Sequence, residues 1–122
     1  MSHTLTWNSN NLFRKFTGDV TGEEILKSNF ELQLHPQFAT IKYLVNDFTE
    51  VENLLIEIEH TKIYASTDDI ISDTKGHFKI AIVVNQDSHV ELAKSYRDSM
   101  KNNLFDCEIF ETVEEARDWC ES

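Results

Sequence analysis

The first apolar residues of the chain alternate with polar ones, which predicts a β-hairpin. Leu5 and Trp7 are separated by polar neighbours, and four turn-forming residues follow at positions 8–11. Residues 12–16 are again rich in apolar side chains and form the second strand of the expected hairpin. Gly18 is expected to end this strand, because isolated glycines often mark the end of an element.

Helical spacing replaces the alternation after Gly18. Thr21 is followed three residues later by Glu24, the pattern of a capping box at a helix start. Pro36 is expected to stop this helix after His35, because proline cannot continue a helix. The apolar positions that recur at helical spacing are Ile25, Leu26, Phe30 and Leu34.

The next apolar segment, Ile41–Val45, predicts a short strand at the centre of a sheet. Asn46 and Asp47 are expected to close it, so that the acidic segment up to Asn53 forms a turn. Ligands of open α/β sheets bind beyond the carboxyl ends of strands. The segment Asp47–Asn53 is therefore the first place to expect a functional site.

A long second helix is predicted over residues 57–74, ending at Gly76. Ile63, Tyr64, Ile70 and Ile71 have the spacing of one helix face. The nearly unbroken apolar segment at 79–84 then predicts a strand that is covered on both faces, with a turn at 85–87.

Two more helices and one strand complete the predicted order. Ser88 with Glu91, and Thr112 with Glu115, repeat the capping-box pattern. The segment 107–110 between these helices predicts a short edge strand. One side of the last helix is expected to carry Val113, Ala116, Trp119 and Cys120.

The order ββαβαβαβα predicts an α/β fold. Helices between the later strands require crossover connections and therefore parallel pairing, whereas the hairpin adds an antiparallel strand at one side. We expect a single domain over residues 1–122, with a four- or five-stranded mixed sheet, an N-terminal β-hairpin and about four helices.

The charge balance excludes several classes of partner. The chain has 22 acidic and 11 basic residues, which give a net charge of −11. This charge repels the phosphates of nucleic acids and the anionic surface of a membrane, so we expect neither nucleic-acid binding nor stable binding to anionic membranes. The chain starts without a signal-peptide pattern and has no apolar segment of roughly 20 residues, so we expect a cytoplasmic protein.

No motif for catalysis or for a cofactor is present. The three glycines, Gly18, Gly22 and Gly76, form no phosphate-binding loop, and no nucleophile stands beside a base at a recognisable spacing. The five histidines are scattered, and the two cysteines are expected to be reduced thiols with Cys107 buried. We therefore expect no enzyme activity, no cofactor and no metal site.

Four ordered segments resemble the SpoIIAA-like proteins of the STAS superfamily: FTGDVTGEEI (16–25), IKYLVNDFTEVE (41–52), FKIAIVVNQD (78–87) and FETVEEARDW (110–119). The resemblance implies a small bacterial α/β domain. In the anti-sigma-factor antagonists of this superfamily, an Asp-Ser pair follows the central strand, and a partner kinase phosphorylates the serine. The counterpart here is Glu52-Asn53-Leu54, which lacks the hydroxyl group, and Thr49 is the nearest alternative acceptor.

The resemblance favours a non-catalytic regulatory or protein-interaction module, either monomeric or homodimeric. A protein partner would bind at the turn after the central strand and at the next turn. The predicted contact residues are Asp47, Thr49, Glu50, Glu52, Asn53 and Asn85.

The alternative function is a carrier or sensor of a small apolar or lipid-like ligand, held between the sheet and the second helix. Some SpoIIAA-like domains resemble lipid-transfer folds, and the chain has a surplus of apolar residues just before the second helix. Leu54, Leu55 and Ile58 are the predicted ligand contacts. Ordinary core packing is the other explanation for these residues.

Overall fold

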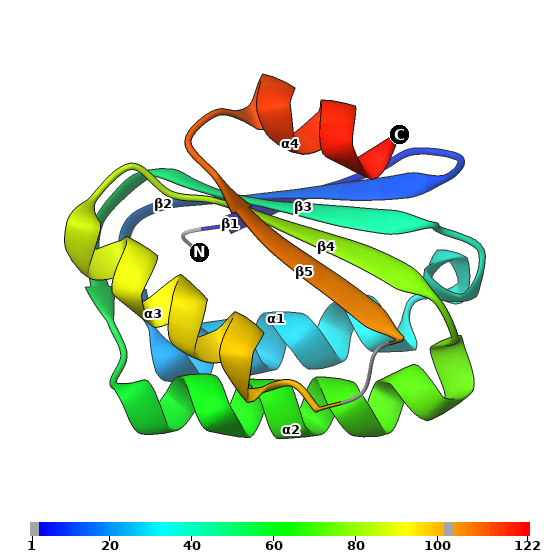
Figure 1. The fold of residues 1–122 in the computed structure, drawn as a ribbon, viewed down its shortest axis with the longest axis horizontal. Helices are drawn as coiled ribbons and strands as arrows, with labels where there is room; N and C mark the ends of the chain where they lie inside the picture. The colour runs from blue at the N-terminus through cyan, green and yellow to red at the C-terminus, as the bar shows by residue number, and fades with distance from the viewer. Residues whose placement is uncertain (1–2, 102–103) are drawn as a thin grey trace.

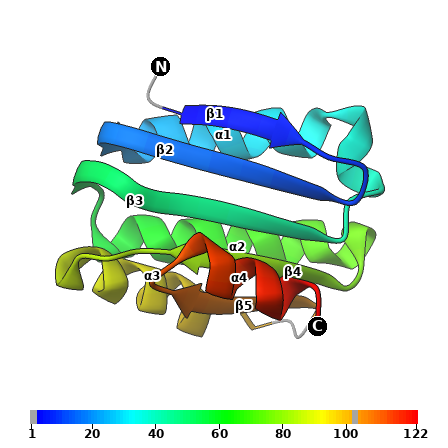
Figure 2. The same cartoon turned by 90° about the horizontal axis from the view of Figure 1, so that it is seen from above.

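A computed structural model describes residues 3–101 and 104–122. Its centre is one five-stranded sheet in the order β1-β2-β3-β4-β5 (Figures 1 and 2). β1 pairs with β2 antiparallel, and all other neighbours pair parallel. The predicted mixed sheet with an N-terminal hairpin is therefore confirmed, and the segment after Ile41 is its central strand. The strands are β1 His3–Trp7, β2 Asn11–Thr21, β3 Tyr43–Leu55, β4 Phe78–Val83 and β5 Phe105–Phe110.

α1, α2 and α3 cover one face of the sheet, and the short α4 covers part of the other (Figure 1). α4 packs on β3, β4 and β5, so β1 and most of β2 have no helix over them on that face (Figure 2). Among the described residues, no helix combines the length and the hydrophobicity needed to cross a membrane. The helices are α1 Gly22–Leu34, the 3-10 helix η1 Pro36–Ala39, α2 Ile58–Lys75, α3 Asp87–Ser99 and α4 Val113–Cys120.

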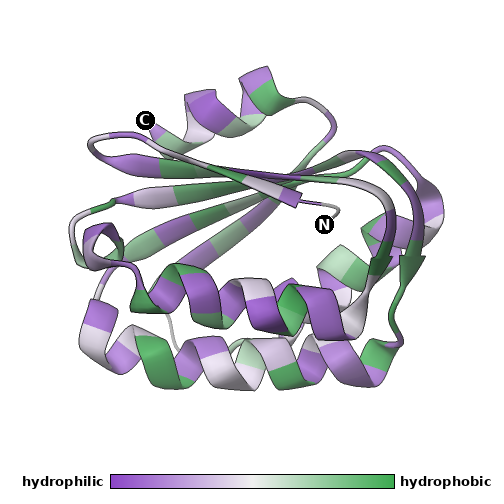
Figure 3. Cartoon of the chain, turned by 180° about the vertical axis from the view of Figure 1, so that it is seen from behind, coloured by the Kyte–Doolittle hydropathy of each residue, from purple (hydrophilic) through white to green (hydrophobic). Residues whose placement is uncertain are grey.

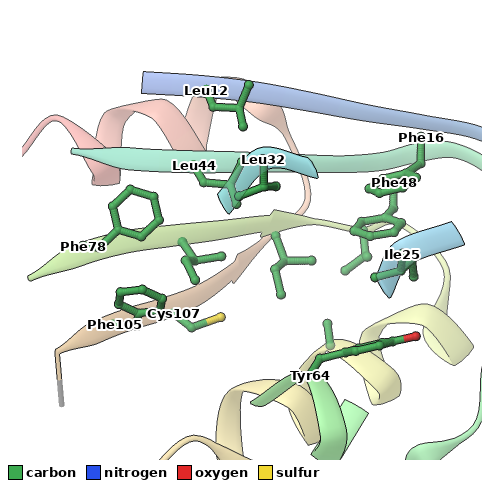
Figure 4. Packing of buried hydrophobic residues seen from close by; sticks show 14 of the residues in the cluster. Leu12, Phe16, Ile25, Leu32, Leu44, Phe48, Tyr64, Phe78, Phe105 and Cys107 are labelled. Carbon is green, nitrogen blue, oxygen red and sulfur yellow. The ribbon is translucent and has the colours of Figure 1, made fainter. Parts of the chain in front are cut away.

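The sheet separates two hydrophobic cores, because neighbouring residues of a strand point to opposite faces. The larger core lies against α1, α2 and α3, and its Phe16 and Phe48 rings stack at 4.8 Å between centroids (Figure 4). The smaller core lies under α4 and includes Val45 and Val83. Cys107 belongs to the larger core and Cys120 to the smaller one, so the sheet keeps these two free thiols apart.

The predicted turn at 46–53 is wrong, because this segment is the second half of β3. β2 also continues past Gly18 to Thr21, and β3 pairs with it over this whole length. Gly18 has a φ of +69° and lies beside a register shift between the two strands, so it bends β2 instead of ending it. The exposed polar residues of this second half, Glu50, Glu52 and Asn53, lie on the part of the sheet that no helix covers.

Two of the three predicted capping threonines or serines do cap a helix. Thr21 and Thr112 each accept a hydrogen bond from the backbone N–H of the glutamate three residues later, at 3.2 Å. The prediction for Ser88 is wrong, because α3 starts at Asp87 and its N-cap residue is Gln86. The capping pattern is therefore not a sufficient start signal, because Ser88 does not cap α3, and it is not a necessary one, because α3 starts without a side-chain cap.

The second helix has nearly the predicted bounds but only half of the predicted buried face. Tyr64 and Ile71 pack against the larger core as predicted. Ile63 and Ile70 are 54% and 69% exposed, because the polar Thr61 and Asp68 are buried in their place. Figure 3 shows hydrophobic residues alternating with hydrophilic ones along α1 and α2. The sequence pattern missed part of the buried face because Thr61 and Asp68 are polar.

The complete burial of Val83 predicts that an aspartate there unfolds the domain. Val83 is 0% exposed, and an unpaired carboxylate in its place carries a desolvation cost comparable with a total stability of roughly 5 to 15 kcal/mol. Val83→Asp should show no cooperative thermal transition by circular dichroism. Thr17→Asp, at an exposed position of β2, is the control and should melt close to the wild type. A folded Val83→Asp variant would contradict the packing of β4 between two layers.

Candidate functional site

A cavity of about 90 Å³ lies between the sheet and α1, α2 and α3. A single water molecule needs about 10–15 Å³ in such a space, so this cavity can hold something larger. Most of its wall is apolar: Ile25, Leu32, Phe38, Leu44, Phe48, Leu54, Ile56, Phe78, Ile80, Ile82, Val84, Leu92, Ala93 and Phe105. The polar side chains in the wall are Arg14, Asn29, Gln33, Asn46, Thr61, Tyr64, Asp68, His89 and Tyr96.

Strand alternation places an arginine inside this wall. Leu12 and Phe16 on β2 are both fully buried in the larger core, and Arg14 lies between them on the same face. Arg14 is only 4% exposed. Its neighbour across the strands is Asn46 of β3, which faces the same side.

Three neutral side chains hold the Arg14 guanidinium. Nε donates to Oδ1 of Asn46 at 2.8 Å, and Nη1 donates to Oγ of Ser28 at 2.9 Å and to Oδ1 of Asn29 at 2.8 Å. The guanidinium carbon also lies 5.1 Å from the centre of the Phe16 ring. Burial lowers the pKa of Arg14 to about 10, which leaves the group a cation at neutral pH.

A carboxyl group from α2 shares the cavity wall with this cation. Asp68 is one helical turn after Tyr64 and is 9% exposed. It accepts hydrogen bonds from the Tyr96 hydroxyl of α3 and from Nε2 of Gln33 of α1, the latter at 3.3 Å. Burial raises the pKa of Asp68 to about 6, although the Tyr96 hydrogen bond and the Arg14 charge oppose this shift.

Arg14 and Asp68 influence each other through the cavity without touching. No ion pair joins them in the described part of the chain, and each raises the stability of the other's charged form through space. His89 contributes another polar group, whose Nδ1 is buried and has no hydrogen-bond partner among the residues that the structure describes. Burial lowers the pKa of His89 and raises that of Cys107 well above its usual range. The cavity thus combines apolar walls with one buried cation and one carboxyl group, an arrangement suited to orienting a small molecule.

The predicted partner-binding residues lie on the opposite side of the sheet. Two register shifts between β2 and β3 interrupt the alternation. As a result Glu50, Glu52 and Asn53 are all exposed on the part of the sheet that α4 leaves uncovered, and Thr49 is partly exposed. Asp47 is only 5% exposed, and its Oδ1 accepts hydrogen bonds from the N–H and the hydroxyl of Thr49, at 2.9 and 2.7 Å.

Polar contacts hold this outer surface together. Lys15 forms an ion pair with Glu50, and Nδ2 of Asn53 donates to Oδ1 of Asp19 at 2.8 Å. β4 pairs with β3 only as far as Asp47. Beyond that point, side chains that follow β4 form hydrogen bonds to the backbone of β3. The side-chain amides of Asn85 and Gln86 donate to the carbonyls of Thr49 and Val51, at 3.4 and 3.0 Å.

The three predicted ligand contacts are divided between the cavity and the surface. Leu54 lines the cavity. Leu55 and Ile58 are 56% and 41% exposed and lie outside it. Strand alternation explains the difference between Leu54 and Leu55, because neighbouring residues of a strand point to opposite faces. Ile58 is the first residue of α2.

The charged residues of the cavity were missed from the sequence. Arg14 stands between two large apolar residues at strand spacing, which was a usable signal of a buried position. Asp68 follows Tyr64 by four residues, but aspartates of an acidic chain are normally solvated. The partner of the Tyr96 hydroxyl lies on another helix, α2, and could not be identified from sequence.

Known proteins resemble this chain in structure but not in recognisable sequence. No family model matches it, and no curated protein matches it. An uncharacterised DUF3478-family protein with a SpoIIAA-like fold from Shewanella loihica PV-4 is 20% identical, with a TM-score of 0.55 over 97% of this chain and 91% of that one. The anti-sigma factor antagonist SpoIIAA in its unphosphorylated form is 7% identical, with a TM-score of 0.60 over 98% of each chain. The chain therefore has a SpoIIAA-like, STAS-like fold.

The raised pKa of Asp68 predicts a characteristic pH dependence of stability. In the folded protein the pKa of Asp68 is about 6, whereas the ordinary pKa of an aspartate is 3.8. The free energy of unfolding should thus decrease as the pH rises from about 4 to about 7, and Asp68 should account for roughly 2 to 3 kcal/mol of this decrease. Urea unfolding at each pH gives the free energy of unfolding of the wild type and of Asp68→Asn. The difference between these two free energies should change by that amount over the range.

The control for this experiment is Asp118→Asn, which removes a negative charge from the exposed surface of α4 and leaves the cavity unchanged. Each variant is compared with the wild type by the difference in free energy of unfolding. If this difference had the same pH dependence for Asp68→Asn as for Asp118→Asn, Asp68 would not be buried as the structure places it.

Proposed function

We propose that this protein binds a small, largely apolar molecule in the cavity between the sheet and α1, α2 and α3, as a carrier or sensor and not as a catalyst. The observation that carries this proposal is an apolar cavity of about 90 Å³ whose wall also contains a buried guanidinium with no ion pair to any described residue. Concave, mainly apolar sites with a few convergent polar groups are the usual form of small-molecule sites.

The size of the cavity restricts the ligand. Pockets for drug-sized molecules are about 300–1,000 Å³, several times larger than the space here. A short hydrocarbon chain or a compact ring fits this volume better than a complete lipid. Each buried methylene group would contribute about 0.8 kcal/mol to affinity, so the walls themselves can supply most of the binding free energy.

A cavity-filling substitution tests the proposal. Ala93 of α3 lines the cavity, and leucine in its place would occupy the space of a ligand without removing any polar contact. We expect butanol and hexanol to shift amide resonances of the cavity wall in the wild type and to bind at least tenfold more weakly to Ala93→Leu. Lys94→Leu adds the same side chain at the next, exposed position and should bind like the wild type.

Native mass spectrometry of the freshly purified protein complements this titration, because a co-purified adduct would identify the ligand directly. Equal binding of the alcohols to Ala93→Leu and to the wild type, or no binding to either, would contradict a ligand site in this cavity.

A second candidate function is the docking of a regulatory protein partner on the outer surface of β2 and β3. The observation in its favour is that Thr49, Glu50, Glu52 and Asn53 share the part of the sheet that no helix covers, with the side chain of Asn85 next to Thr49. One of the proteins with this fold is an anti-sigma factor antagonist. An acidic surface of this kind suits a basic partner.

Charge reversal at this surface tests the second candidate. The double variant Glu50→Lys and Glu52→Lys should lose a partner that the wild-type protein captures from cells, because like charges would now face each other. The control reverses two exposed acidic residues of α4, Glu114→Lys and Asp118→Lys, and should retain the partner. If both double variants captured the same proteins, the partner would not dock on β2 and β3.

A further inference from the structure

We propose that Arg14 binds the carboxylate group of a small, otherwise apolar acid held in the cavity. This inference rests on the proposed function, since it names the chemical class of the cavity's ligand. It starts from the donors of a single side chain and their acceptors.

The hydrogen bonds of Arg14 leave one nitrogen without an acceptor. Arginine has five N–H donors. Nε uses one of them on Asn46, and Nη1 uses two on Ser28 and Asn29. In the part of the chain that the structure describes, the two donors of Nη2 have no acceptor.

The free nitrogen faces the cavity. Among the described residues, His89 Nδ1 is the fully buried side-chain nitrogen or oxygen that lacks a hydrogen-bond partner. Nη2 of Arg14 also lacks a partner, so it must keep some accessible surface. Arg14 as a whole is only 4% exposed and forms part of the cavity wall. The accessible surface of Nη2 therefore opens into the cavity, where it meets a bound molecule.

The charge of Arg14 also has no carboxylate of the described residues in direct contact with it. The three acceptors of Arg14 are neutral. A buried cation without a counterion is costly, and an anion at Nη2 would remove that cost. The three hydrogen bonds and the Phe16 ring already hold the guanidinium in place, so binding would require little further ordering.

The geometry favours a carboxylate over a phosphate. A single nitrogen with two N–H groups can satisfy one anionic oxygen, whereas a phosphate has three strong acceptor oxygens and a charge near −2. Asp68 in the same wall makes a second negative charge on the ligand unfavourable. The remaining walls are mostly apolar, so the rest of the ligand should be a hydrocarbon.

Matched pairs of probes separate this inference from the proposed function. We would titrate the isotopically labelled protein with butanoate and butanol, and with hexanoate and hexanol, at pH 7.5. A charge-assisted hydrogen bond should make each acid bind on the order of tenfold more tightly than its alcohol. Butyl phosphate, as a third head group, should bind no more tightly than butanol.

Two substitutions in the cavity locate the interaction. Arg14→Gln removes the charge but keeps an amide with two N–H donors for some of the acceptors Asn46, Ser28 and Asn29, and it should remove the preference for the acids. Arg14→Lys keeps the charge and should retain part of that preference. Asp68→Asn removes the opposing charge, so it should tighten binding of hexanoate and leave binding of hexanol unchanged.

The outcomes are distinct. Alcohols that bind while the acids bind no more tightly would leave the proposed function standing and overturn the role of Arg14. A preference for the acids that persists in Arg14→Gln, or an unchanged ratio in Asp68→Asn, would also overturn it. The same holds if butyl phosphate binds more tightly than butanoate. If neither alcohols nor acids bind, the proposed function fails and this inference fails with it.

Discussion

The burial of the Arg14 guanidinium under the sheet is the interaction on which the interior of this protein depends. One side chain connects β2, on which it stands, with β3 through Asn46 and with α1 through Ser28 and Asn29. A buried cation tolerates few arrangements of its neighbours, because each lost hydrogen bond would leave a charged donor in an apolar medium. Arg14 therefore restricts the position of α1 against the sheet as well as the chemistry of the cavity.

Asp68 links α2 to the other two helices of this layer. Its carboxyl group accepts hydrogen bonds from Tyr96 of α3 and from Gln33 of α1. The Tyr64 hydroxyl of α2 also donates to the carbonyl of Gly22 at the start of α1, at 2.8 Å. A layer of helices linked by polar contacts at several points can enclose a cavity without collapsing into it, because the contacts hold the helices at fixed positions.

The similarity to SpoIIAA is a similarity of backbone. With 7% and 20% identity, the two solved structures share the arrangement of strands and helices with this chain and few of its side chains. Alternation across the sheet, crossover helices and two cores can be built from many sequences, since volume and patterning matter more than identity. What the cavity and the outer surface of β2 and β3 can bind has to be argued from the residues of this chain, among them Arg14 and Asp68.

The sequence by itself determined the order of elements, the fold class, the helix caps at Thr21 and Thr112 and the two-sided burial of β4, because each depends on local periodicity or on a neighbour three residues away. Tertiary structure alone decided the rest.

The length of β3 depends on its pairing with β2, and the polar residues after Val45 look like a turn until that pairing is known. Leu54 and Leu55 differ only in which side of the sheet they face. Arg14 and Asp68 are charged residues of an acidic chain, and only their acceptors and donors on three other elements make them part of one cavity. Those partners are 14 to 35 positions away in the chain, beyond the reach of any local pattern.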